Sequence, residues 1–481
     1  MCKCACGKPW PCKAAAKWSM SVTPATSRRS SCTCAWAIPN NSGSPISTRC
    51  LAAGASTAKP VTAVRAWQRC AKLPVHLSQQ RRPEPMAMRF EWRTSLCAAD
   101  FPAEACEALR LRVADHTPFN NLGWLCAAEQ ALGENQHLHI LLGWEAEALR
   151  LCLPLVASRE RFAGLKFRVL HHLGYPLADR LALLSLLGSE DMHKALLLIR
   201  ERLPHALLQL NELSEPAGEE SALTEWMARS STAERRLSCR VPVHLISDAD
   251  RQEVTGDPRY KLRRARKRIA ACGAQIRRIT PDALSMGAVL QTISEVEALS
   301  WKGDEGVGIF ATPHSRQWIE RAFTALAGQG LVRVVMLELN GRCISYRLGL
   351  LEQGRLYDYN LAFLPQHADL GSGRVLLEEW IRWGLDEQWH WIDASRVSLE
   401  NSSHQLHERM TGQLEHWRWS FYSWRPSGLL LGLGLRLWYC VKPALQKWRA
   451  QRAGRPTAVN TSAIQPAPSS TTPGLAPRRA S

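Results

Sequence analysis

Apolar and polar positions follow a strand-like pattern in the first part of the chain. Apolar runs at 138–144 and 148–156 flank the acidic turn 145–147, and this arrangement predicts a β-hairpin. The run at 167–170 continues the same sheet. We therefore expect a β-sheet before residue 171.

The spacing of apolar residues then becomes helical. Residues 181–213 are expected to be mainly helical, with a new turn starting at 204–209. The polar stretch 214–231 is expected to be a loop or domain junction, and 241–246 a short strand. We place a domain boundary near Ser247.

A second succession of elements begins with a basic amphipathic helix at 257–272. Asp257 is its expected N-cap, and Pro258 takes the first helical position. Its polar surface carries Arg259, Lys261, Arg263, Arg264, Arg266, Lys267 and Arg268. This surface is either solvated or in contact with phosphate, RNA or an anionic membrane. Few aromatic residues are interleaved, so sequence-specific reading of nucleic acid has little support.

The following residues predict the order helix, helix, three antiparallel strands, glycine loop, helix, strand. Asn340-Gly341 and Gln353-Gly354 separate the three β-rich runs, and Asn-Gly between strands is a strong hairpin signal. The helices are expected at 283–300, 315–327 and 372–388, the strands at 331–339, 343–351, 355–363 and 390–394, and loops at 301–313 and 364–371.

The C-terminal region is apolar and then polar. Residues 428–441 (GLLLGLGLRLWYCV) are too short to span a bilayer and contain Arg436. Basic residues flank them, so the segment either packs on the domain as a helix or lies in a membrane interface. The Pro, Thr, Ser and Ala content of 454–481 predicts a disordered tail.

Composition sets the first 87 residues apart from the rest. The chain carries a formal charge of +18, but 13 of its 61 Lys and Arg and none of its 43 acids lie before Glu84, so the remainder carries only +5. The basicity is therefore weak support for a nucleic-acid partner. Residues 1–87 are expected to be disordered, or to result from a start codon assigned too early.

Cysteine and histidine do not form a metal-binding pattern. Eight of the 16 cysteines lie before residue 84, and Cys2, Cys4, Cys6 and Cys12 lack the paired spacing of zinc modules. His171 and His172 lie near Asp179, but no third ligand is suitably spaced. We expect no metal, and the absence of a pairing pattern indicates reduced thiols and a cytoplasmic protein.

A candidate phosphate site lies where the glycine loop meets the helix at 372–388. Unpaired backbone N–H groups and the helix dipole favour an anion at such a helix start. Gly371, Ser372 and Gly373 allow close approach, and Arg374 adds a charge. Many helices begin with Gly and Ser merely as caps, so the motif alone is weak.

The second half resembles a known family in several short segments. These are SWKG at 300–303 after the helix containing Glu297, 308–310, the hairpin with Gly341, the strand with Tyr357 and Tyr359, 371–377 and 391–393. They resemble the acyltransferase domain of cellulose-biosynthesis CelD-type proteins, which belong to the GNAT superfamily and are related to FemAB/FemX aminoacyl ligases. The resemblance covers roughly residues 110–400.

The resemblance implies an α/β fold of tandem GNAT-like domains, each a mixed, mostly antiparallel sheet flanked by helices. The expected domains are 88–246 and 247–425, followed by an apolar and basic helix at 426–453. The resemblance also implies that an acyl carrier, usually acyl-CoA, binds in the second domain. Ala368 stands where a standard GNAT has Gln or Arg, and this departure leaves the carrier's identity open.

Acyl transfer needs a proton acceptor and groups that stabilise the developing charge. Glu297, Asp358 and Asp393 are the candidate bases, and Tyr359 together with Tyr357 is a candidate to protonate the leaving thiolate. Trp301 and Lys302, with Tyr357, are expected to line the acceptor site. Each carboxylate is equally compatible with a surface or sheet-edge position.

The acceptor is expected to be an amine or hydroxyl compound, in polysaccharide or envelope biosynthesis. One alternative is a FemX-like ligase that takes an amino acid from aminoacyl-tRNA. Another is a non-catalytic scaffold that contacts the inner face of the membrane through 428–441.

Overall fold

The computed structural model describes residues 87–214, 223–225, 230, 232–394 and 409–453. The N-terminal segment 1–86, most of the junction expected at 214–231 and the tail 454–481 lie outside these ranges. The metal-binding alternative for the first cysteines therefore also lies outside the described residues.

The first half of the described chain contains two helices, a set of antiparallel strands, a third helix and two further strands. They are β1 (Arg89–Arg93), α1 (Ala103–Arg112), η1 (Pro118–Asn120), α2 (Leu122–Gln130), β2 (His137–Glu145), β3 (Ala148–Phe162), β4 (Leu165–His172), α3 (Ser189–Arg202), β5 (Leu207–Ser214) and β6 (Ala233–Leu245).

The second half has a similar succession, with an additional helix at each end. Its elements are η2 (Asp248–Arg251), α5 (Gly256–Ala271), β7 (Gln275–Ile279), α6 (Met286–Ala298), α7 (Trp301–Glu305), α8 (Pro313–Gly328), β8 (Val332–Leu339), β9 (Arg342–Glu352), β10 (Arg355–Phe363), η3 (Pro365–Leu370), α9 (Ser372–Asp386), β11 (Trp391–Asp393), β12 (Gly412–Tyr422) and α10 (Pro426–Ala453).

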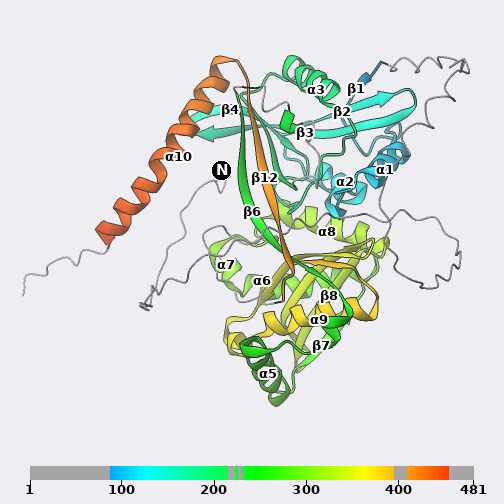
Figure 1. Cartoon of the computed structure of the whole chain (residues 1–481), viewed down its shortest axis with the longest axis vertical. Coiled ribbons are helices and arrows are strands. Elements are labelled where there is room, and N and C mark those ends of the chain that lie inside the picture. The colour runs from blue at the N-terminus through cyan, green and yellow to red at the C-terminus, as the bar shows by residue number, and fades with distance from the viewer. Residues whose placement is uncertain (1–86, 215–222, 226–229, 231, 395–408, 454–481) are drawn as a thin grey trace, which may run out of the picture. The chain divides into compact units, whose positions relative to one another are not determined.

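All the named strands form a single mixed sheet with the order β1-β2-β3-β4-β5-β12-β6-β11-β10-β9-β8-β7. Only two pairs are parallel, β4 with β5 and β10 with β11. Helices flank this sheet (Figure 1). The predicted α/β class, with mixed and mostly antiparallel sheet between helices, is confirmed.

The two halves repeat the same topology. Each has an edge strand, two helices, three antiparallel strands, a helix and a strand parallel to the third, as β1 to β5 and β7 to β11 show. Each half then contributes its last strand to the other half, because β6 pairs with β11 and β12 pairs with β5. The long β6 and β12 also pair with each other, which makes the sheet continuous (Figure 1).

The predicted hairpins of the second half are confirmed. Asn340 and Gly341 have φ of 54° and 75°, and Gln353 and Gly354 have 48° and 71°. Positive φ at both central residues matches the twist of paired strands, and Gly adopts this conformation without a Cβ penalty. These turns bring β8, β9 and β10 into antiparallel register.

Several predicted elements differ from the structure. Only Ser189–Arg202 is helical within 181–213, whereas Leu207–Ser214 is a strand. This strand lies between β4 and β12 and is largely buried, including its polar residues Asn211 and Glu212, so apolar and polar positions do not alternate along it. The sequence reading also missed β12, and it expected a loop where the short helix α7 lies.

The basic helix α5 begins earlier than predicted. Its N-cap is Thr255 and Gly256 is its first residue, so Asp257 lies within the first turn. The apolar face is as predicted, with Leu262, Ala265 and Ile269 buried. An acid in the first turn still stabilises the helix through its dipole.

Candidate functional site

The start of α9 has the backbone geometry expected of an anion-binding site. Gly371 is its N-cap and has φ of 65°, in the left-handed region. A Cβ added at Gly373 would meet nothing within 4 Å, so the first turn is open at that point. The amides of the first turn and the helix dipole favour an anion here.

Arg347 on β9 holds this first turn in place. Its Nε and Nη2 donate to the carbonyl oxygen of Gly373 over 3.2 and 3.0 Å, and its Nη1 pairs with Asp358. Both charged side chains are almost completely buried. Burial raises the pKa of Asp358, and the neighbouring Arg347 counteracts this rise. Asp358 therefore belongs to the support of the helix start.

The basic helix α5 lies beside the candidate anion site. The Cβ of Ala265 would be 3.4 Å from a Cβ added at Gly371, and Arg268 donates to the carbonyl oxygen of Asp369 in η3. The exposed basic residues of α5 therefore raise the positive potential near the start of α9.

Glu297, Asn360 and Lys302 form a connected polar group on the sheet face opposite Asp358. Asn360 donates to Glu297 Oε2 over 2.7 Å, and Lys302 Nζ donates to Asn360 Oδ1. The amide of Phe310 donates to Glu297 Oε1 over 3.0 Å. Burial lowers the pKa of Lys302, while the nearby carboxylate of Glu297 opposes this change. A buried lysine of this kind is a candidate functional group.

The two predicted tyrosines lie in an aromatic cluster between the halves. Tyr359 donates to the carbonyl oxygen of Leu177 over 2.9 Å, and its ring contacts Phe119, 5.5 Å between centroids. Tyr357 is buried, which raises its pKa to about 12, and its ring contacts Trp391. Tyr359 is thus anchored to the first half through its hydroxyl group.

Asp393 pairs with an arginine that comes from the first half. Arg180 Nη2 donates to Asp393 Oδ1, and Arg180 Nη1 lies 3.7 Å from Asp179 Oδ2. The guanidinium also lies 6.0 Å from the ring centroid of Tyr357. Arg180 is 1% exposed and Asp393 is fully buried. The second-half site is therefore completed by a residue from the loop between β4 and α3.

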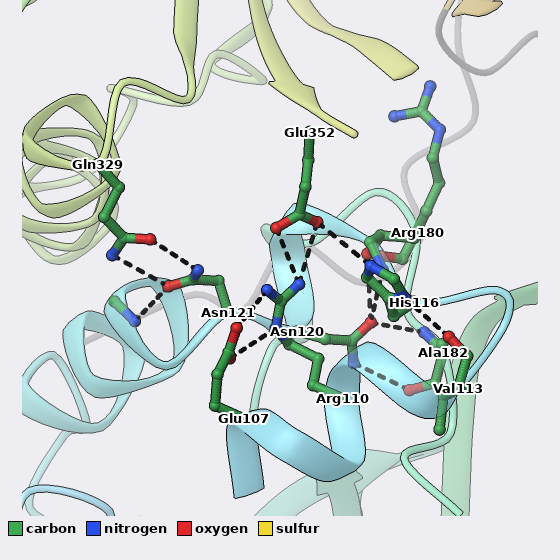
Figure 2. A network of polar contacts seen from close by, with 12 residues as sticks. Glu107, Arg110, Val113, His116, Asn120, Asn121, Arg180, Ala182, Gln329 and Glu352 are labelled. Carbon is green, nitrogen blue, oxygen red and sulfur yellow. Dashed lines mark hydrogen bonds and ion pairs between the residues drawn. The ribbon is translucent and has the colours of Figure 1, made fainter. Parts of the chain in front are cut away.

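Two polar residues of the first half hold the Arg180 loop. Asn120 exchanges hydrogen bonds with the backbone of Ala182, 2.9 and 3.0 Å long, and Thr117 Oγ1 donates to the carbonyl oxygen of Arg180 over 2.9 Å. Figure 2 shows Asn120 and Ala182 in this arrangement. The backbone is thereby held at Arg180 and at Ala182.

β10 extends past its pairing with β11 in the described part of the chain. β11 is three residues long and its pairing with β10 reaches Tyr357↔Asp393, while β10 continues to Phe363. The pairing of β10 with β9 shifts between Asp358 and Asn360, so Tyr359 is a bulged residue. A bulge turns side chains away from the regular alternation, and bulges are frequent beside active sites.

Residues 256–411 match the family model described as the acetyltransferase (GNAT) domain. The chain carries a GNAT domain. It is an acyltransferase, as the sequence reading expected. No curated protein matches the chain.

Three solved structures illustrate the weaker similarities. The FemX crystal structure is 9% identical, with TM-score 0.49 and coverage of 71% of this chain and 100% of that one. A tandem GNAT protein from the clavulanic acid biosynthesis pathway is 12% identical, with TM-score 0.41 and coverage of 69% and 98%. L-PGS from Bacillus licheniformis is 10% identical, with TM-score 0.40 and coverage of 68% and 95%. Each TM-score lies below 0.5, so none of the three supports a statement about this chain.

Most of the site residues predicted from the sequence fall into three groups in the structure. Asp358 lies behind the start of α9 with Gly371, Ser372 and Gly373, and Ser372 Oγ donates to Ser345 Oγ over 2.9 Å. Glu297 and Lys302 meet through Asn360, and Asp393 and Tyr357 meet at Arg180. Two remaining predicted residues, Trp301 and Arg374, are 40% exposed and intermediate in exposure, respectively.

Sequence reasoning missed Arg347, Asn360 and Arg180. Asn360 lies two positions after Asp358 on the same strand, and Arg347 is a charged residue inside an apolar strand. A buried charge in a strand signals a specific partner, so Arg347 was detectable. Arg180 had no such local signal. Within the described residues there is no group of three or more His, Cys, Asp or Glu that would hold a metal ion.

Proposed function

We propose that this chain transfers an acyl group from acyl-CoA to an amino or hydroxyl acceptor, in the biosynthesis of cell-surface polysaccharide or another envelope component. The main support is the start of α9, where the N-cap Gly371 in the left-handed conformation follows β10 and η3 and leaves a helix end suited to an anion. The phosphates of the carrier bind the amides of Ser372 and Gly373, with Arg374 adding charge. The thioester then lies where β10 and β11 diverge.

In this proposal the candidate catalytic groups lie on the face that carries Glu297, Lys302 and Asp393. Attack by the acceptor forms a bond to the acyl carbon, breaks the C–S bond and transfers the acceptor's proton to a base and finally to the thiolate. Glu297 and Asp393 remain the candidate bases, and Tyr359 and Tyr357 the candidate acids. Asp358 is separated from these groups because it lies on the opposite face of the sheet, where it pairs with Arg347.

We assign the donor site to the second of two domains, 88–246 and 247–425. The corresponding region of the first half is filled by its own chain. Leu181 forms a parallel bridge with Leu213 on β5, beyond the point where the β4–β5 pairing ends at His171↔Gln209. The first domain then serves to supply Arg180 and the acceptor side of the site.

Isothermal titration with acetyl-CoA and longer acyl-CoAs tests the proposal. We expect the wild-type protein to bind at least one of them, and Gly373→Asp to weaken binding at least tenfold because a carboxylate there repels phosphate. Gly287→Asp is the matched control: Gly287 is also the second residue of its helix, with nothing within 4 Å of an added Cβ. Absence of binding by the wild-type protein would overturn the proposal.

The basic helix beside the donor site also supports an alternative, transfer from aminoacyl-tRNA. Arg264 and Lys267 are exposed on α5, and Arg268 of the same helix contacts η3. Phosphate contacts by such a surface are independent of nucleotide sequence. Transfer that is abolished by ribonuclease treatment would favour this alternative over acyl-CoA.

We further propose that the protein is cytoplasmic and touches the inner face of the membrane through α10. The sequence reading judged 428–441 too short to span a bilayer, but the helix extends over Pro426–Ala453. Among the described residues, Pro426–Leu445 is the single helix segment that is long and apolar enough to cross a membrane by length and composition, and only 17% of it is buried. An exposed apolar face with flanking basic residues suits an interfacial helix.

A further inference from the structure

Three strands depart from regular pairing beyond the level at which Tyr357, Asp393 and Val243 pair. Tyr359 is the extra residue on β10, Ser238 is the extra residue on β6 opposite His416 and Trp417, and β5 has an extra residue between Leu210 and Leu213. The last irregularity includes Glu212, which has φ of 56° although it is not glycine. Residues in this conformation are strained and concentrate at functional sites.

His416 on β12 lies on the same sheet face as Asp393. Asp393 pairs with Val243 on β6, and Cys239, four residues away on that strand, pairs with His416. Paired residues share a face, and residues four apart in a strand share it too. Arg180 connects the two ends of this row. Its neighbour Leu181 and the ring of His416 both donate to the carbonyl oxygen of Glu212, over 3.1 and 3.2 Å, and Arg180 Nη2 donates to Asp393.

The hydrogen bonds of His416 determine which of its ring nitrogens carries the proton. Nδ1 lies 3.2 Å from the carbonyl oxygen of Glu212, which only accepts, so Nδ1 carries the hydrogen. Nε2 of the neutral ring is then a hydrogen-bond acceptor. His416 is 1% exposed, and Nε2 has no hydrogen-bond partner in the described part of the chain.

The environment keeps this imidazole uncharged. Burial, and to a smaller extent the charge of Arg180, lower the pKa of His416 to about 4, although Glu212 on β5 and Asp179 in the loop oppose the change. The carboxylate of Glu212 is itself held by Ser238 Oγ at 2.8 Å and Cys239 Sγ at 3.3 Å. At neutral pH His416 is thus a fixed, neutral acceptor.

Arg180 offers the complementary donors. Its Nε and Nη1 are buried and have no hydrogen-bond partner among the described residues, since Asp179 Oδ2 lies 3.7 Å from Nη1. Leaving a buried polar group without a partner costs about 1–3 kcal/mol. A donor pair and a lone acceptor on one buried face therefore call for a ligand that both donates and accepts.

We propose that His416 and Arg180 form the binding site of the acceptor, and that this acceptor is a hydroxyl compound of the sugar class. A hydroxyl group donates to Nε2 of His416, and its own or a neighbouring oxygen accepts from Arg180. An ammonium group fits less well, because it has no lone pair for Arg180 and is repelled by the guanidinium. The inference rests on the proposed acyl transfer and names its acceptor.

The bound hydroxyl group is then the nucleophile or a neighbour of it. A new C–O bond forms at the acyl carbon, the C–S bond of the thioester breaks, and the hydroxyl proton ends on the thiolate as the free thiol of CoA. The products are a sugar ester and CoA. Both His416 and Arg180 orient the acceptor without changing their own protonation.

The test measures the rate at which free CoA is released from acetyl-CoA as the concentration of D-glucose is varied. Glucosamine, which carries an ammonium group, is used in a parallel series. We expect saturation by glucose at a lower concentration than by glucosamine. His416→Asn keeps a donor for the carbonyl oxygen of Glu212 but removes Nε2. It should raise KM for glucose about tenfold, because one hydrogen bond to the acceptor is lost. The Kd for acetyl-CoA should not change.

His205→Asn is the matched control. His205 is also buried, and its Nδ1 donates to a backbone carbonyl, that of Leu203. It should leave KM unchanged. Equal KM in wild type and His416→Asn, or no glucose-dependent release by a wild-type protein that binds acetyl-CoA, overturns the acceptor site alone. Failure to bind acetyl-CoA overturns the proposed function instead.

Discussion

Gly308 illustrates how a single residue without a side chain fixes the candidate site. A Cβ at this position would overlap the carboxylate of Glu297, which packs directly against the glycine. That carboxylate accepts from the amide of Phe310 and from Asn360, and Asn360 in turn accepts from Lys302. The glycine therefore determines the position of a chain of three polar side chains.

The variant Gly308→Ala should displace Glu297 and leave Asn360 without its acceptor. Losing buried hydrogen bonds costs about 1–3 kcal/mol, so we expect urea unfolding to show a loss of about 2 kcal/mol, and CoA release to fall more than tenfold. Gly287→Ala, in an exposed helical position with nothing within 4 Å, should be neutral or slightly stabilising. A Gly308→Ala protein of unchanged stability and activity would contradict the assigned contacts.

At the scale of elements, α10 combines a buried contact with a largely exposed surface. Leu431 is 3% exposed and packs with Tyr422 and Phe167, whereas Leu433 and Leu437 are 60% and 57% exposed. The buried side attaches the helix to the end of β12 and to β4. Its other side carries more apolar surface than a helix in contact with water alone needs.

The double variant Leu433→Glu/Leu437→Glu should abolish co-sedimentation with vesicles of phosphatidylethanolamine and phosphatidylglycerol. Two charges on the exposed face remove apolar area and repel anionic lipid, while Leu431 keeps the helix attached. CoA release in solution should be retained. Leu165→Glu, which adds a charge at a leucine that is 54% exposed on β4, is the control and should still bind. Vesicle binding by the double variant would disprove the membrane contact.

At the scale of the whole molecule, buried ion pairs connect the two halves. Arg110 on α1 donates to both carboxylate oxygens of Glu352 on β9, over 2.9 and 3.0 Å, and is also held by Glu107 (Figure 2). Asn121 and Gln329 form a second link, 2.8 Å long. Together with the exchanged strands β6 and β12, these contacts favour unfolding of the described residues as a single unit.

Glu352→Ala should lower the free energy of unfolding by about 3 kcal/mol, because Arg110 keeps only its partly exposed partner Glu107. Urea denaturation should still show one transition with an unchanged slope. The exposed pair of Arg251 and Asp248 is the control, and Arg251→Ala should change stability by less than about 0.5 kcal/mol. Two separate transitions would show that the halves unfold independently.

The predictable part of the fold and site was local. The hairpin turns, the basic helix and the glycine start of α9 follow from residue types whose backbone preferences act over a few positions. The strand β5 was read as helix because a strand covered on both sides shows no alternation. Among the site residues, Arg180 was not predictable, because its partner Asp393 is 213 positions away.

The sequence by itself determined the succession of elements in the second half and the glycines that open the start of α9. Glycine tolerates positive φ and close approach, and no distant contact is needed for that preference. Only the tertiary structure decided that β6 and β12 change places between the repeats, and that Arg180 of the first half reaches Asp393 of the second. These arrangements depend on which distant surfaces pack against each other. The spacing of apolar residues in an element shows which of its faces is buried, but not which other element covers that face.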